Sequence, residues 1–243
     1  MKRVLVLVGQ GARPPRSLEG LSDAQVSEWK MEYDVLAALE ALGYEPRTVE
    51  VSYDLNRIRD AVEEHKPHVV FNMLEDFHGH VVFDQNVVAY LELLRVPFTG
   101  CNPRGLVLSR DKALTKKVCA YHRIPTPRFQ VCLRGRKVRR LKKGVEFPLI
   151  VKSLREDASV GISQASIVND DEALADRVKF IHERIGTDAI AERFIEGREL
   201  YVGVVGNHRL EVFPVWELVF GSIPESAPKI ATQKVKFDID YQE

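Results

Sequence analysis

The sequence has 243 residues, with 35 basic and 35 acidic side chains, and 45% of its residues are hydrophobic. Its length allows one or two compact domains with a core, and its balanced charge excludes a disordered tail and a strongly basic nucleic-acid binder. Three dispersed cysteines are too few for a disulfide scaffold, and no apolar run approaches the roughly 20 residues that span a bilayer. We therefore expect a cytoplasmic protein with no membrane segment.

The first hundred residues alternate short apolar strand patterns with amphipathic helix patterns. Strands are expected at residues 4–8, 45–51, 68–71 and 96–99. Between them, apolar side chains recur every three or four residues around residues 29–39, 58–62 and 87–94, as in helices with one buried face. This alternation predicts a parallel, doubly wound sheet.

From Ser109 onward the pattern changes to α+β with antiparallel pairing. Helices are expected over 114–121 and over 174–185, the second capped by Asp170 or Asp171. Strands are expected at residues 129–133, 147–151, 167–168, 189–192, 199–205 and 209–215. The Gly206-Asn207 pair is typical of the tip of a hairpin between the last two of these strands.

The most informative motif is an apolar strand that ends in Lys152 and precedes a loop of small residues. A lysine at the end of a buried strand is unfavourable unless it meets an anion. The loop contains Ser159 and Gly161, and small residues allow backbone N–H groups to approach phosphate oxygens closely. The pattern alone is equally consistent with a lysine that reaches solvent beside an ordinary hairpin.

Two further motifs have features of a nucleotide site. Glu192 and Glu199 lie at the two ends of a short connection that opens a hairpin, where backbone groups can pair with a base and a carboxylate can accept from ribose hydroxyls. Lys112 lies at the start of a helix, where the helix dipole disfavours a lone cation but favours a bound phosphate. The alternatives are solvated glutamates and an exposed helix charge.

These three motifs, in this order, resemble the ATP-grasp fold and most closely the D-alanine–D-alanine ligase family. The connecting segments are similar as well: Phe71-Asn72-Met73-Leu74, Pro97-Phe98-Thr99-Gly100, Asp111-Lys112, Ile124-Pro125-Thr126-Pro127 and Phe213-Pro214. The resemblance implies an N-terminal pre-ATP-grasp domain at 1–105, a central ATP-grasp lobe at 106–188 and the start of a C-terminal lobe at 189–243.

The resemblance also implies roles for individual residues. The lysines Lys112 and Lys152, and less securely Lys236, would hold ATP phosphates, and Ser159-Val160-Gly161 would form the closing phosphate loop with Lys152, Ser159 and Gly161 in catalytic positions. Glu192, Phe194 and Ile195 would hold adenine, and Glu199 the ribose. ATP and Mg²⁺ or Mn²⁺ would be the cofactors, because charge develops on the transferred phosphoryl group.

The substrate side departs from the family pattern, which leaves the amino-acid substrates open. Asp84 aligns with a family position, and His78, in a His-Gly-His segment, is a candidate for substrate contact. Metal binding by His78 and His80 is a weaker alternative because further ligands are not defined, and a solvated loop is a third. The basic run 134–143 could attract RNA, but it lacks interleaved aromatic residues and is expected to be a solvated connection.

Family members are expected to continue for roughly another hundred residues that carry the Mg²⁺ ligands, so the chain is expected to be truncated and to contain no metal ligands. The leading hypothesis is an ATP-dependent carboxylate–amine ligase of cell-wall (peptidoglycan) biosynthesis that acts through an acyl phosphate on small amino-acid or peptide substrates. Neither nucleic acid nor membrane is an expected partner, and a homodimer is common among similar enzymes. The alternative hypothesis is a nucleotide-binding protein without catalysis.

Overall fold

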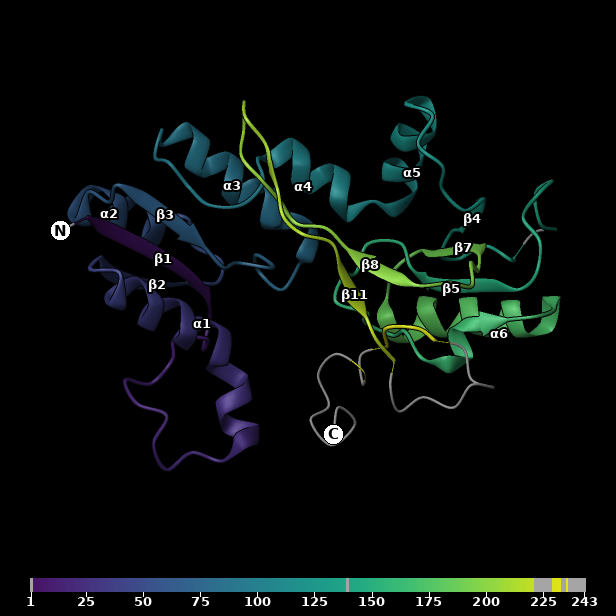
Figure 1. Cartoon of the computed structure of the whole chain (residues 1–243), viewed down its shortest axis with the longest axis horizontal. Coiled ribbons are helices and arrows are strands. Elements are labelled where there is room, and N and C mark those ends of the chain that lie inside the picture. Colours follow the sequence, from purple (N-terminus) through teal and green to yellow (C-terminus); the bar gives the residue numbers. More distant parts are fainter. Residues whose placement is uncertain (1, 139, 221–228, 233–234, 236–243) are drawn as a thin grey trace. The chain divides into compact units, whose positions relative to one another are not determined.

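The computed structural model describes residues 2–138, 140–220, 229–232 and 235 (Figure 1). The chain divides into two compact units, the first ending at Arg110 and the second beginning at Asp111. The finer division into three parts, at 105 and 188, stays a prediction. No described helix combines the length and the apolar character needed to cross a membrane.

The first unit is built on a parallel sheet with the strand order β2-β1-β3. The strands are β1 (Arg3–Gly9), β2 (Glu45–Val51) and β3 (Val69–Asn72). The fourth strand expected at 96–99 is reduced to one bridge between Phe98 and Val70. The reason is that the backbone N–H of Asn72 donates to the Thr99 hydroxyl, 3.0 Å away, instead of continuing the backbone ladder.

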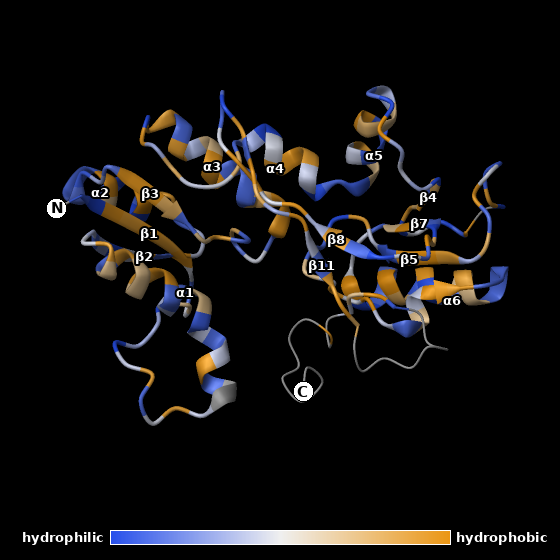
Figure 2. Ribbon diagram, viewed as in Figure 1, coloured by the Kyte–Doolittle hydropathy of each residue, from blue (hydrophilic) through white to orange (hydrophobic). Residues whose placement is uncertain are grey.

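Helices cover both faces of this sheet, as the doubly wound prediction requires. On one face, Val4, Val6 and Val8 pack against Leu36 and Leu39 of α1 (Asp23–Ala41). On the other face, Leu5 and Leu7 join a core with residues of α2 (Asn56–His65) and α3 (Asp84–Leu93). Figure 2 shows β1 as a continuous apolar strand, because a strand buried on both faces alternates between two cores.

Short helical segments connect this sheet to the second unit along the chain. A 3₁₀ turn (Val81–Phe83) precedes α3, and α4 (Pro103–Arg110) follows the last bridge. The sequence analysis did not predict α4. Its start carries a recognisable signal, because Asn102 accepts a hydrogen bond from the Gly105 N–H at 2.9 Å and proline is favourable in a first helical turn.

The second unit is built on an antiparallel sheet with the strand order β4-β7-β5-β6. The strands are β4 (Phe129–Cys132), β5 (Leu149–Ser153), β6 (Ile167–Val168) and β7 (Ala189–Arg193). A 3₁₀ turn (Gln164–Ser166) precedes β6. The order confirms the α+β prediction with antiparallel pairing.

One helix packs against each face of this sheet. Helix α6 (Asp171–Phe180), extended by a π-helical turn (Ile181–Ile185), covers Leu149, Val151, Ala189 and Ala191. Asp170 caps α6 by accepting from the Ala173 N–H at 2.8 Å. On the opposite face, Ala113 of α5 (Lys112–Tyr121) packs with Ile190 and Leu154.

A long hairpin follows the sheet. It pairs β9 (Val204–Val205) with β10 (Glu211–Val212) and β8 (Glu199–Tyr201) with β11 (Trp216–Leu218). The strand expected at 199–205 is divided into β8 and β9, and the strand expected at 209–215 is reduced to β10, while β11 lies beyond it. The register shifts by one residue between the two pairs, near Pro214, which has no N–H to donate. The turn requires glycine at Gly206, where a Cβ atom would lie 2.0 Å from the Arg209 carbonyl oxygen.

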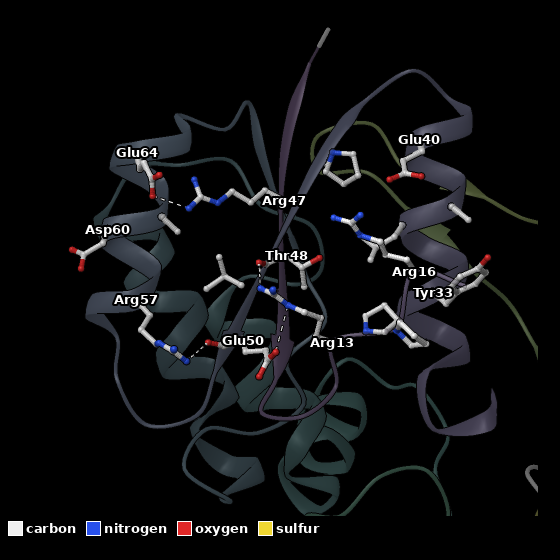
Figure 3. A pocket seen from close by; sticks show the side chains of 17 residues that line it. Arg13, Arg16, Tyr33, Glu40, Arg47, Thr48, Glu50, Arg57, Asp60 and Glu64 are labelled. Atoms are coloured by element: carbon white, nitrogen blue, oxygen red, sulfur yellow. Dashed lines mark hydrogen bonds and ion pairs between the residues drawn. The ribbon is translucent and has the colours of Figure 1, made fainter. Parts of the chain in front are cut away.

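A cavity of about 1140 Å³ lies beside β2 in the first unit (Figure 3). Several of its charged side chains are exposed and are engaged in ion pairs or hydrogen bonds. Arg13 donates to the Thr48 carbonyl at 2.8 Å and Arg57 to the Glu50 carbonyl at 3.0 Å. These contacts occupy backbone acceptors on the outer edge of the sheet, where an open edge would invite pairing with another strand.

Candidate nucleotide site

Residues from the predicted nucleotide motifs line one cavity of about 330 Å³ in the second unit. The predicted residues that line it are Lys152, Ser159, Glu192, Phe194, Ile195 and Glu199. They come from β5, from the loop after it, from β7 with the connection that follows, and from the start of β8. The fold therefore brings together two motifs that lie about 40 positions apart in the sequence.

Strand register explains why Lys152 and Glu192 meet. In the antiparallel pair β5–β7, Ile150 is opposite Glu192 and Lys152 is opposite Ile190. Residues two apart on a strand share a face, so the Lys152 and Glu192 side chains are diagonal neighbours on the face opposite α6. Lys152 Nζ forms an ion pair with Glu192 Oε1.

A second lysine, which the sequence analysis missed, reaches the same carboxylate. Lys116 Nζ lies 2.5 Å from Glu192 Oε2, and the two side chains are only 13% and 7% exposed. Lys116 Nζ also lies 5.8 Å from the centre of the Phe129 ring. A signal was present in the sequence, because Lys116 follows Lys112 by four residues and so lies on the same face of α5.

The two lysines determine the ionisation of Glu192. Burial by itself raises the pKa of this carboxyl group, but Lys152 and Lys116 outweigh burial and the net pKa is lower than usual. The carboxylate is therefore a fixed, buried acceptor with two cations beside it. A buried charge with such partners is a feature of functional sites as well as of structural ion networks.

Lys112 lies near this cluster but contacts the loop instead. Its Nζ donates to the Glu156 carbonyl at 2.6 Å and lies 3.7 Å from Asp157 Oδ1. Burial lowers the pKa of Lys112, while Asp157 acts in the opposite direction and Lys152 adds to the lowering. Lys112 does not line the 330 Å³ cavity.

The loop after β5 has an unusual backbone. Ala158 and Ser159 have φ angles of 50° and 63°, in the left-handed region that costs L-residues free energy. Ser159 Oγ donates to the Ala231 carbonyl at 2.8 Å. Gly161, with φ of 71°, has no room for a Cβ, because Ile185 Cδ1 would lie 3.0 Å away, and Arg177 donates to its carbonyl.

The remaining predicted nucleotide residues surround the mouth of the cavity. The Phe194 N–H donates to the Pro148 carbonyl at 2.9 Å, and the Ile195 side chain is 61% exposed. The Tyr201 hydroxyl donates to Glu199 Oε1 at 2.5 Å, and this bond raises the pKa of Tyr201 to about 12. Lys236 lies outside the described residues.

The predicted substrate residues lie in the first unit. Asp84 is buried and accepts from Arg110 Nε at 2.9 Å and Nη2 at 2.7 Å, and from the Gln85 N–H at 2.5 Å. His78 has a φ of 57°, and its ring centre lies 6.0 Å from that of Tyr53 and 6.4 Å from that of His80. A role for either residue in substrate binding stays a prediction.

Among the described residues, no group of three or more His, Cys, Asp or Glu side chains could hold a metal ion. The described part of the chain therefore supplies no fitted Mg²⁺ or Mn²⁺ site.

Comparisons with known proteins find similarity to the D-alanine–D-alanine ligases. The family described as "D-ala D-ala ligase C-terminus" matches residues 119–225. A D-alanine–D-alanine ligase of Syntrophotalea carbinolica is 32% identical over 216 residues, which are 88% of this chain and 63% of that protein. A D-alanine–D-alanine ligase of Desulforudis audaxviator is 31% identical over 221 residues, 90% of this chain and 66% of that protein.

Solved structures share the fold. The D-alanine–D-alanine ligase of Bacillus anthracis complexed with ATP matches with a TM-score of 0.66 at 23% identity, over 92% of this chain and 68% of that one. The VanG D-Ala:D-Ser ligase of Enterococcus faecalis matches with a TM-score of 0.64 at 18% identity, over 89% and 69% of the two chains. The parallel sheet, the antiparallel sheet and these matches define an ATP-grasp fold.

Within that class, the chain is similar to the D-alanine–D-alanine ligases, by the family match over residues 119–225 and by the identity to curated ligases over most of its length. It spans 63% and 66% of the two ligases named above. It also spans 44% of an uncharacterised protein, y4sG, of Sinorhizobium fredii, with 35% identity over 153 residues.

Proposed function

We propose that this chain binds ATP in the cavity of the second unit and belongs to an enzyme that joins a carboxylate to an amine. The observation that supports the proposal most directly is the shared cavity of Lys152, Ser159, Glu192, Phe194, Ile195 and Glu199. It combines a flexible cation, a loop of small residues, a buried carboxylate and apolar side chains within one space. The lysine and the loop suit the phosphates of a nucleotide, the buried carboxylate and the apolar side chains suit its base, and Glu199 suits its ribose.

Each group has a proposed role. Lys152, with Lys112 near the loop, neutralises negative charge on the phosphates, and the backbone of the Ser159–Gly161 loop donates to phosphate oxygens. Glu192, Phe194 and Ile195 hold adenine, and Glu199 holds the ribose. Mg²⁺, when bound, would supply further neutralisation of the transferred phosphoryl group.

The proposed reaction has two steps. A carboxylate oxygen attacks the γ-phosphorus of ATP, the bond to the bridging oxygen breaks, and ADP leaves with an acyl phosphate formed. A neutral amine then attacks the acyl carbon, inorganic phosphate leaves, and the amine loses a proton to give the amide. The positioned lysines suit this chemistry because charge develops on the phosphoryl oxygens and must be neutralised in place.

The identity of the acceptor and donor is proposed only as a class, namely small amino acids, of which D-alanine is the first to test. In the first unit, Asp84 and His78 are the proposed contacts with that side of the reaction. A homodimer is the proposed assembly.

The test has a binding arm and a turnover arm. In calorimetric titration, the chain should bind ATP, Lys152→Met should bind it at least about tenfold more weakly, and the exposed Lys137→Met should bind it unchanged. Failure of the unchanged chain to bind ATP would overturn the proposal. Phosphate release should then depend on amino acids, screened as pairs that include D-alanine; binding without release under any pair would favour a nucleotide-binding protein without catalysis.

A further inference from the structure

Glu192 is shared by two lysines, and this sharing has a consequence for nucleotide binding. Lys152 holds one carboxylate oxygen and Lys116 the other. Lys152 comes from β5 and lines the cavity, whereas Lys116 comes from α5 and is absent from the cavity lining. The two cations therefore approach one anion from different elements.

The proposed function gives Lys152 a second partner. If Lys152 turns to a phosphate, it withdraws from Glu192, which is 7% exposed. A buried carboxylate left without a cation is strongly unfavourable, so withdrawal of Lys152 by itself would oppose phosphate binding. Lys116 stays against the other oxygen and removes most of that cost.

We infer that Lys116 is a positioning residue that keeps Glu192 neutralised while Lys152 exchanges the carboxylate for a nucleotide phosphate. This inference rests on the proposed function. It goes beyond it in assigning a task to a lysine that touches neither base nor phosphate and in predicting that Lys152 changes partner when the nucleotide binds.

The position of Lys116 supports the exchange. Its helix is fixed at the start by Asp111, which accepts from the Leu114 N–H at 2.9 Å, and by the Lys112 N–H, which donates to the Leu154 carbonyl at 3.3 Å. Ala113, on the same helix, is buried against the sheet. A side chain carried by this anchored turn and 13% exposed has little freedom to follow a ligand, while Lys152 is 24% exposed and borders the cavity.

The inference predicts a difference between ligands with and without phosphates. Adenosine does not require Lys152 to leave Glu192, but ATP does. Lys116→Met should therefore weaken ATP binding at least about tenfold and adenosine binding less than about threefold. Lys116→Arg, which keeps the cation, should bind both ligands within about threefold of the unchanged chain.

A double-mutant cycle separates this task from a general structural one. In a Glu192→Gln background the neutral amide needs no cation, so adding Lys116→Met should change ATP affinity by less than about threefold. The matched control is Lys117→Met, an exposed neighbour on the same helix, which should leave both affinities unchanged.

The outcomes are distinct when affinities are measured by calorimetry on the 1–243 chain. Equal losses for ATP and adenosine in Lys116→Met, or a loss that persists in the Glu192→Gln background, would overturn the inference and assign Lys116 a merely structural role. ATP affinity of Lys116→Met equal to that of Lys117→Met would also overturn it. No ATP binding by the unchanged chain would overturn the proposed function, and the inference with it.

Discussion

Two groups of charged residues, one in each unit, contain the same kinds of side chain in very different surroundings. Beside β2, Arg47 and Glu64 lie 2.7 Å apart, with side chains 42% and 67% exposed. On the face of the antiparallel sheet, Lys116 and Glu192 lie 2.5 Å apart at 13% and 7% exposure. The contact distances are similar, and the difference is burial.

Burial, not contact distance, therefore distinguishes the two groups of charges. It marks the Glu192 cluster, and not the Arg47–Glu64 pair, as the candidate functional site. Water screens the exposed pair, which also loses side-chain entropy on forming, so such pairs contribute little to stability. In the buried cluster, removal of the shared Glu192 carboxylate leaves two poorly solvated lysines without an anion. Such a cluster carries a cost in desolvation, and the proposed nucleotide binding is a reason for a fold to retain it.

The largest loss of folding stability is expected for Glu192→Ala. It leaves Lys116 of α5 and Lys152 of β5 without their shared anion, and we expect the free energy of unfolding to fall by about 3 kcal/mol. Chemical denaturation followed by circular dichroism measures this. A loss no greater than that of Glu64→Ala would remove the distinction between the two groups.

The next largest loss of stability is expected for Asp84→Ala, which tests whether breaking a buried ion pair is also destabilising in the first unit. Asp84, which is 3% exposed, pairs with Arg110, and Asp84→Ala should reduce the free energy of unfolding by about 2 kcal/mol because it leaves a mostly buried guanidinium. Hydrogen exchange at α3 and α4 would locate the loss. Asp60→Ala, an exposed change in the same unit, serves as its control.

A smaller effect is expected from pH. The pKa of Glu192 is lower in the folded chain than in the unfolded one, so its carboxylate stabilises the fold above the unfolded pKa of about 4.3. This contribution is lost as the pH falls through the lower, folded pKa. The stability difference between the unchanged chain and Glu192→Gln, measured from pH 7 down to pH 3, should be constant above about pH 5 and should narrow below about pH 4. A stability difference that is independent of pH would show that the Glu192 carboxylate does not stabilise the fold through its charge.

The smallest effect is expected for Glu64→Ala. Arg47 remains solvated without its partner, so the thermal midpoint should be unchanged within measurement error at physiological salt. A clear decrease that disappears in 1 M salt would show that the exposed pair contributes more than its surroundings predict.

Most of the fold could be predicted from local patterns. The apolar run at Val4 to Val8 indicated a strand buried on both faces, and the structure confirms it between two cores. The strand expected at 96–99 was only partly right, because the Thr99 hydroxyl takes the hydrogen bond that would have extended the ladder. Helix α4 was missed, although Asn102 marks its start.

The candidate site likewise has a part that the sequence indicated and a part that only the fold revealed. The order of Lys112, Lys152, the Ser159 loop, Glu192 and Glu199 along the chain was sufficient to indicate the nucleotide motifs and the family, because each motif is local in sequence. Lys116 was not found: its spacing from Lys112 placed the two lysines on one face of a helix, but its partner Glu192 lies 76 positions away, and local sequence does not indicate such a distant pair.

The sequence by itself indicated most of the strands and helices, the resemblance to a ligase family and the residue types of the candidate nucleotide site, because periodicity and short motifs depend on neighbouring residues. Tertiary structure decided which charges became partners. The register of β5 against β7 places Lys152 beside Glu192, and the packing of α5 on that face adds Lys116. That packing shields these charges from water, whereas Arg47 and Glu64 in the first unit lie exposed on β2 and α2. This difference in solvation could be read only from the folded chain.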